Sequence, residues 1–125
     1  MSAPPGRTVL VADDNPDQRA LYVDILTNAG YAVIEACDGA EAIARARTDR
    51  PGLILMDVTM PGTSGWNAVR AVRDQMETRD IPVIVVTGLA GTGDRDASFA
   101  AGSDAYLSKP VSPRRLLEEV RRFLA

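Results

Sequence analysis

The chain has 125 residues, of which 46% are hydrophobic and 25% charged, a composition typical of one globular domain. Its 14 basic and 17 acidic side chains give a net charge of −3, and the pI is about 4.9. This balance argues against a nucleic-acid partner bound mainly by neutralising phosphates.

The chain has a single cysteine, Cys37, which excludes an internal disulfide and is typical of a cytoplasmic protein. We expect the Cys37 side chain to be a small packed residue. The uncharged stretch 81–93 is shorter than the roughly 20 residues of a membrane helix, so no membrane partner is expected. Residues 1–6 read as a flexible leader before one domain at 7–125. With no histidine, the chain holds no imidazole base, imidazole metal ligand or phosphohistidine of its own.

The first predicted strand covers the apolar run at residues 8–12. Asn15 can cap a helix that has proline at its first position, and Gln18 stands where it would close a capping box. Gly30 is expected to end this helix, and a second strand is predicted over residues 32–34.

The next segment repeats this order. Asp38 and Glu41 form a second capping-box pattern, which predicts a helix over residues 40–47 that stops at an Arg-Pro pair. A third strand is predicted over residues 53–56 and a third helix over 64–74.

The last segment predicts a strand over residues 83–86, a weak helix over 94–101 and a weak strand over 105–107. Ser112, followed by proline, opens a final helix whose apolar residues recur at helical spacing. Four arginines share this helix with glutamates 118–119, and we expect a solvated face of ion pairs there.

Strict alternation of short apolar strands and helices predicts an α/β fold with a parallel sheet buried on both faces. We expect five strands in the order 2-1-3-4-5, doubly wound with five helices as in flavodoxin-like proteins. Ligands of such sheets bind beyond the carboxyl ends of the strands, at the switch point between the first and third strands.

Polar side chains follow the predicted strands at that edge. They are Asp13 and Asp14 after the first strand, Asp57 after the third, Thr87 after the fourth and Lys109 after the fifth. Two carboxylates about 4 Å apart repel by roughly 4 kcal/mol at an effective dielectric of 20, so a cation is expected among them. Oxygen ligands without histidine suit Mg²⁺, or Mn²⁺, together with a phosphoryl group.

The same residues suggest phosphoryl chemistry. Asp57 is the best candidate nucleophile, because a carboxylate beside a metal and a lysine can attack phosphorus to give an aspartyl phosphate. Lys109 and Thr87 can donate hydrogen bonds to the phosphoryl oxygens. Since phosphoryl transfer needs mainly positioning and charge stabilisation, no general base is required.

These motifs, with Pro61 and Gly65 after Asp57 and with Pro110 after Lys109, resemble the receiver domain of bacterial two-component response regulators over residues 7–124. The resemblance implies a phosphoacceptor at Asp57. It implies that Mg²⁺ is held by Asp14, Asp57 and the backbone carbonyl of Thr59, with Asp13 acting through water. The phosphoryl donor would be a partner histidine kinase or histidine phosphotransfer protein.

The resemblance also implies a switch. Thr87 would turn toward the phosphoryl group while Tyr106 swings inward, and the fourth helix, fifth strand and fifth helix would signal to a downstream effector protein. The Lys109–Pro110 peptide bond is expected to be cis. Thr59 and Leu89 occupy positions that tune hydrolysis of the phosphoryl group in this family, and since Leu89 cannot orient a water, we expect a long-lived phosphorylated state.

Two other functions fit this sequence less well. An aspartate-nucleophile phosphatase of the haloacid dehalogenase type would want an acid at position 59, where threonine stands. A phosphorylation-independent interaction module would not need the full set of charges. We therefore expect a stand-alone receiver that is no enzyme beyond its own phosphorylation and dephosphorylation, either monomeric or dimeric on phosphorylation; a domain excised from a longer regulator is the alternative.

Overall fold

The computed structural model describes residues 7–57, 65–88 and 94–124. Within them, the strands are β1 (Thr8–Ala12), β2 (Ala32–Ala36), β3 (Leu53–Asp57), β4 (Val83–Thr87) and β5 (Ala105–Ser108). The helices are α1 (Pro16–Asn28), α2 (Gly39–Asp49), α3 (Gly65–Asp74), α4 (Asp94–Ala101) and α5 (Pro113–Phe123). The strands form a parallel sheet in the order β2-β1-β3-β4-β5, which confirms the predicted topology.

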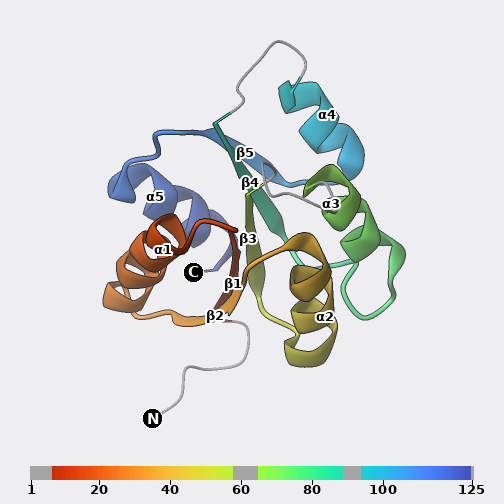
Figure 1. Ribbon diagram of the computed structural model, residues 1–125, viewed down its shortest axis with the longest axis horizontal. Helices are drawn as coiled ribbons and strands as arrows, with labels where there is room; N and C mark the ends of the chain where they lie inside the picture. The colour runs from red at the N-terminus through yellow and green to blue at the C-terminus, as the bar shows by residue number, and fades with distance from the viewer. Residues whose placement is uncertain (1–6, 58–64, 89–93, 125) are drawn as a thin grey trace.

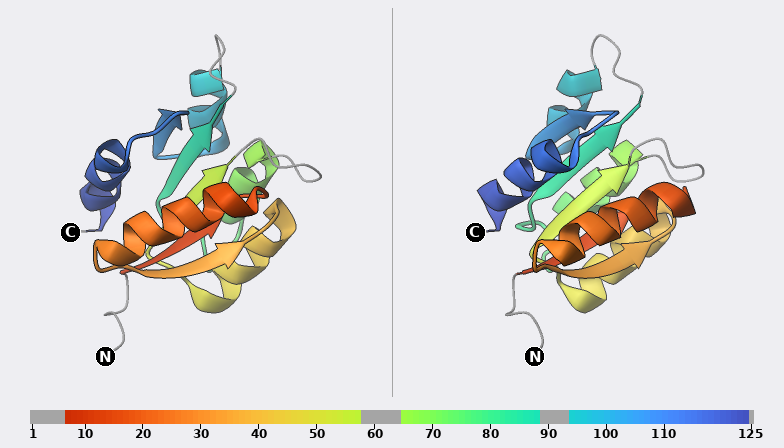
Figure 2. Two further views of the ribbon diagram at one scale, coloured as in Figure 1. Left: turned by 60° about the vertical axis from the view of Figure 1, so that its left-hand side comes forward. Right: turned by 90° about the vertical axis from the view of Figure 1, so that its left-hand side faces the viewer.

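The sheet lies between two helical layers. Helices α1 and α5 cover one face, and α2, α3 and α4 cover the other (Figure 1). The strand arrows all run the same way, so their carboxyl ends meet at one edge (Figure 2). Every residue of β3 and β4 is buried, as expected for central strands of a parallel sheet covered on both faces.

Alternate strand residues supply the two cores. The core under α1 and α5 is built on Val9, Val11, Leu53, Leu55, Ile84 and Val86, together with Leu26, Leu116 and Val120 of the helices. The core under the other helices is built on Leu10, Ile54, Met56, Val83 and Val85, together with Ala42, Ala46, Val69 and Val72. This packing fixes the register of each strand, because a slip by one residue would exchange its two faces.

The predicted helix caps are present. Asn15, Asp38 and Ser112 each accept hydrogen bonds from backbone N–H groups two or three residues later. Gly30 follows the last turn of α1 with φ +97°, a left-handed conformation that glycine adopts readily. Arg50 ends α2 with φ +45°, so this helix stops in a left-handed residue one position before the proline.

Several elements extend beyond the apolar pattern that predicted them. Strand β2 continues through Ala36, because Glu35 and Ala36 pair with Val11 and Ala12 of β1. The predicted range 32–34 was too short, since backbone pairing does not depend on side-chain hydropathy.

One surface expectation was wrong, and a second was only partly right, because the expected ion pairs of α5 form but one of their glutamates is buried. Cys37 is exposed, and the negative charge of Glu41 is the main reason that the pKa of its thiol is raised. Glu119 on α5 is buried, and its two carboxylate oxygens form ion pairs with Arg115 at 2.9 Å and with Arg122 at 2.8 Å. The arginines therefore pair with a carboxylate that packs inward, and α5 is not a fully solvated ionic face.

Arg73, near the end of α3, joins three segments. Its guanidinium donates to the carbonyls of Gly102 at 2.8 Å and Ile81 at 2.6 Å, and pairs with Asp104 at 2.5 Å. Asp104 also accepts from the backbone N–H of Val83 at 2.9 Å. These contacts anchor the carboxyl end of α4 and the start of β5 to the rest of the sheet. Throughout the described ranges, every helix is too short or too polar to cross a bilayer.

Candidate phosphoryl and metal site

The candidate site lies where β1, β3, β4 and β5 end. Asp13 and Thr87 are fully buried, Asp57 is 3% exposed, and Asp14 is exposed at the mouth of the site. Asp13, Asp14 and Asp57 each offer a carboxylate oxygen within 4.8 Å of the other two. The strand order thus brings together acidic residues that are more than 40 positions apart in sequence.

The turn after β1 holds Asp13 firmly. One oxygen, Oδ1, accepts from the backbone N–H of Asn15 at 2.9 Å, and the Asp13 carbonyl accepts from Arg19 at 2.6 Å. Arg19 also pairs with Glu35 on β2 at 3.0 Å, which ties α1 to the sheet edge. The other carboxylate oxygen, Oδ2, is buried and has no hydrogen-bond partner among the described residues.

The electrostatics of this cluster oppose the charged form of Asp13. Burial is the main cause that raises its pKa from 3.8 to about 6, and the nearby Asp57 carboxylate raises it further. The effect reaches Tyr22 on α1, where burial, then Asp13 and Asp57, raise the pKa to about 12. The described part of the site therefore carries more negative charge than its side chains neutralise.

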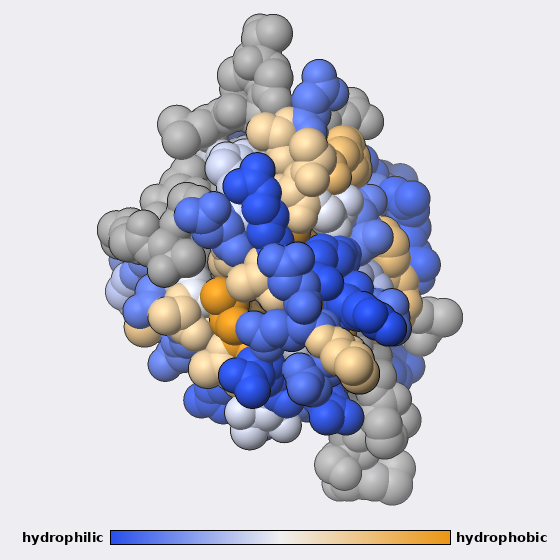
Figure 3. Space-filling view, turned by 90° about the vertical axis from the view of Figure 1, so that its right-hand side faces the viewer, coloured by the Kyte–Doolittle hydropathy of each residue, from blue (hydrophilic) through white to orange (hydrophobic). Residues whose placement is uncertain are grey.

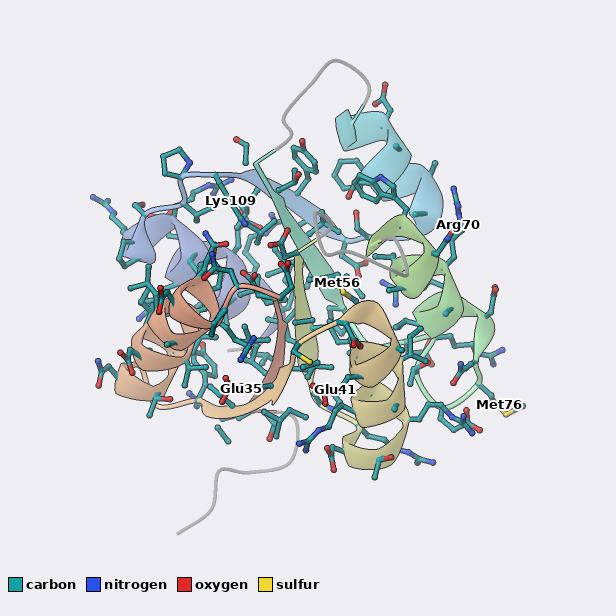
Figure 4. All side chains as sticks on the ribbon, in the orientation of Figure 1. Glu35, Glu41, Met56, Arg70, Met76 and Lys109 are labelled. Atoms are coloured by element: carbon teal, nitrogen blue, oxygen red, sulfur yellow. The ribbon has the colours of Figure 1, made fainter. Side chains whose placement is uncertain are left out.

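Lys109 supplies the cation that the described residues place in the site. Its Nζ donates to Asp57 Oδ2 at 2.9 Å and to Gln18 Oε1 at 2.6 Å, and its side chain is 18% exposed. Figure 4 shows Lys109 reaching from the segment after β5 toward the strand ends. Its backbone N–H donates to the Thr87 carbonyl at 2.8 Å, and the Lys109–Pro110 peptide bond is cis.

Gln18 and Arg19 were not identified as site residues from the sequence. The sequence predicts a capping box in which the Gln18 side chain accepts from the backbone N–H of Asn15, but in the structure that N–H donates to Asp13. Their position could have indicated a role in the site, because both residues lie near the start of α1, which begins shortly after Asp13 and Asp14.

Tyr106 lies on β5, partly buried against the core under α2, α3 and α4. It lines a cavity of about 450 Å³ between β5 and the start of α5, and a second cavity of about 210 Å³ beside α4. Thr87 ends the neighbouring strand, two positions beyond Val85, the residue with which Tyr106 is in register. Thr59 and Leu89 lie outside the described residues.

The donor set fits a hard divalent cation. Three carboxylates converge, one of their oxygens is buried without a partner, and a single ammonium offsets them among the described side chains. Mg²⁺ binds one or two carboxylates and keeps several waters, so this acidic cluster suits it. A bound cation would relieve both the orphaned oxygen of Asp13 and the repulsion with Asp57.

Comparison with known proteins identifies the family. Residues 9–121 match the response regulator receiver domain. The chain belongs to the response regulator receiver domain family. It is 38% identical over 118 residues to the polar-differentiation response regulator DivK of Brucella anthropi, covering 94% of this chain and 96% of that protein.

Solved receiver structures show the same architecture. The chemotaxis protein CheY4 of Vibrio cholerae superposes with a TM-score of 0.88 at 35% identity, covering 94% of this chain and 98% of that one. The receiver domain of a sensor histidine kinase from Pseudomonas aeruginosa superposes with a TM-score of 0.86 at 34% identity, covering 93% and 95%. That structure has a magnesium ion coordinated in its active-site cleft. This chain is therefore a response regulator receiver of two-component signalling.

Proposed function

We propose that this receiver is a phosphorylation-controlled switch whose phosphoacceptor is Asp57. The observation that carries the proposal is the buried Asp57 carboxylate at the end of β3, bonded to Lys109 and grouped with Asp13 and Asp14. The donor would be a phosphohistidine of a partner kinase or phosphotransfer protein, because this chain has no histidine. The cytoplasm, where such partners act, is the proposed location.

The reaction is a substitution at phosphorus. A carboxylate oxygen of Asp57 forms the new P–O bond, and the P–N bond to the donor imidazole breaks with its electron pair going to nitrogen, which takes up a proton. Mg²⁺, or Mn²⁺, when bound, supplies positive charge that offsets the charge on the transferring group. We assign its ligands to Asp14, Asp57 and the Thr59 carbonyl, with Asp13 acting through water.

Lys109 and Thr87 act as hydrogen-bond donors to the transferred group. The Lys109 ammonium already contacts Asp57 and has three donors, so it can keep this contact and also bind a phosphoryl oxygen. Thr87 stands at the end of the adjacent strand β4. The phosphoryl group carries about −1.5 to −2 charges where the Asp57 carboxylate carried −1, and its additional acceptor oxygens would draw the Thr87 hydroxyl inward.

We assign the output to the surface formed by α4, β5 and α5, with Tyr106 as the coupling side chain and a downstream effector protein as partner. Two cavities on this surface share Tyr106 and Arg115, and Phe99 of α4 is 43% exposed. The space-filling view looks onto the side of the molecule where α2, α3 and α4 lie, with α5 out of view, and apolar residues gather near its top, at the α4 end (Figure 3). An inward movement of Tyr106 would reshape both cavities at once.

Incubation with acetyl phosphate and Mg²⁺ tests the proposal. Intact mass spectrometry should find one phosphoryl group per chain, absent in Asp57→Asn and absent when EDTA replaces Mg²⁺. Asp24→Asn, an exposed carboxylate on α1, is the matched control and should be phosphorylated normally. Continuous phosphate release without a phosphorylated protein would favour the phosphatase alternative, and an unmodified mass would leave only a binding module.

A further inference from the structure

We propose that Gln18 is a positioning residue for Lys109, holding the ammonium over the site so that one N–H is directed to the incoming phosphoryl group. The proposal rests on the function proposed above and extends it to a residue of α1. It starts from the contact between Lys109 Nζ and Gln18 Oε1 at 2.6 Å, which joins residues 91 positions apart.

Gln18 is held in place by its own helix. Its backbone N–H donates to the Asn15 side chain at 3.1 Å, in a first turn that begins with a proline. Its side chain is partly buried, and so is the contact with Lys109. The carboxamide therefore presents its oxygen from a fixed backbone position.

The local sequence would normally give this side chain another partner. A glutamine three residues after an N-cap residue commonly bonds back to the backbone N–H of that cap. Here the N–H of Asn15 is bonded to Asp13 Oδ1 at 2.9 Å instead. The active-site aspartate takes over the capping interaction, which leaves the Gln18 carboxamide to bind Lys109.

The chemistry of the acceptor suits the site. A second carboxylate on Lys109 would add a fourth negative charge to a cluster that already destabilises the charged form of Asp13. A carboxamide oxygen accepts the hydrogen bond without adding charge. Of the three N–H donors of the ammonium, Asp57 and Gln18 take two. Among the described residues the third has no partner, so it can bind a phosphoryl oxygen while the side chain is already held in place.

The sequence permits an unusually direct test, because Lys109 is the only lysine of the chain. Protein labelled with ¹⁵N-lysine gives a single side-chain ammonium resonance, so its position and its exchange with water report on Lys109 alone. Gln18→Met keeps the length of the side chain but removes the carboxamide. Gln18→Glu keeps an acceptor oxygen but adds a charge. Leu21→Gln, at a 55% exposed position of the same helix, is the matched control.

In Gln18→Met, the ammonium resonance should shift and exchange faster with water. Phosphorylation by acetyl phosphate and Mg²⁺ should slow by about tenfold, the effect of losing one hydrogen bond to a charged group. Thermal stability and the Kd for Mg²⁺ should stay close to those of the parent protein. In Gln18→Glu the resonance should stay protected, while phosphorylation slows because the added carboxylate competes with the phosphoryl oxygen for the ammonium.

Equal phosphorylation rates in the parent, Gln18→Met and Gln18→Glu would overturn the positioning role, whatever the resonance shows. An unchanged ammonium resonance in Gln18→Met would overturn it as well. If Gln18→Met fails to fold, Gln18→Glu alone decides by its rate. A parent protein that takes up no phosphoryl group would instead overturn the proposed function, so the two failures are distinguishable.

Discussion

Asp13 provides the most quantitative prediction, because its burial opposes ionisation. Its side chain is inaccessible to solvent, its Oδ2 has no partner among the described residues, and its pKa is raised from 3.8 to about 6. A difference of about two pK units corresponds to about 2–3 kcal/mol between the folded and unfolded states. Without a divalent cation, the ionised Asp13 should destabilise the fold by that amount.

The pH window follows from the direction of the shift. Between about pH 4 and pH 6 the folded state keeps a proton that the unfolded chain has lost, so the free energy of unfolding falls as pH rises through this range. Below the window Asp13 is protonated in both states, and its contribution vanishes. Asp13→Asn removes this titration and keeps an oxygen to accept from the Asn15 N–H.

The assay is urea unfolding followed by circular dichroism, in EDTA, across this pH range. Near pH 7.5, Asp13→Asn should raise the free energy of unfolding by about 2–3 kcal/mol, and near pH 4 the gain should shrink below about 1 kcal/mol. Asp24→Asn, at an exposed position of α1, should change stability by less than about 0.5 kcal/mol at either pH. A gain that is equal at both pH values, or absent at pH 7.5, would refute burial of the charge as the cause.

Three further substitutions test the local structure. Arg50→Gly should raise the free energy of unfolding by about 0.5–1 kcal/mol in urea melts, because glycine adopts φ +45° without strain. Gly102→Ala should lower it by about 1–3 kcal/mol, since φ is +113° and a Cβ would lie 2.7 Å from Arg73 Cγ; an unchanged midpoint would contradict this. Glu41→Gln should speed the reaction of Cys37 with a thiol-specific disulfide reagent at pH 8, because the carboxylate that mainly raises the thiol pKa is gone while a capping acceptor remains.

Local signals in the sequence predicted most of the fold. The caps at Asn15, Asp38 and Ser112 and the left-handed Gly30 depend on residues within one turn of each other, so they can be read without the tertiary structure. The strand order 2-1-3-4-5 is one of the few that alternation and right-handed crossovers allow, and the structure confirms it. This strand order also predicted that the acidic residues after β1 and β3 would meet.

Contacts between distant segments could not be predicted in this way. Glu119 reads as a surface residue in an arginine-rich helix, yet it is buried once α5 packs on the sheet. The sequence predicts that Gln18 caps the helix by binding the backbone N–H of Asn15, yet Asp13 binds that N–H and Gln18 binds Lys109. Arg73 gave no signal, because the carbonyls it binds come from loops that approach only in the folded chain. In each case several groups compete for one partner, and the outcome depends on three-dimensional proximity.

The energetics of the site link its instability to its use as a switch. A fold selected only for stability would not leave a carboxylate oxygen of Asp13 buried with no partner in residues 7–57, 65–88 and 94–124, nor set it beside Asp57. The same arrangement makes binding of a positive charge favourable. The repulsion between the carboxylates is already present, and the backbone that holds them is already fixed. A cation and the Lys109 ammonium would therefore hold the Asp13 and Asp57 carboxylates together. A phosphoryl group that binds both the cation and the ammonium would change the charge balance at the ends of β3, β4 and β5 at the same time. The carboxylate repulsion in the resting site thus favours binding of a cation, and the site depends on that cation to accept the further negative charge of a phosphoryl group.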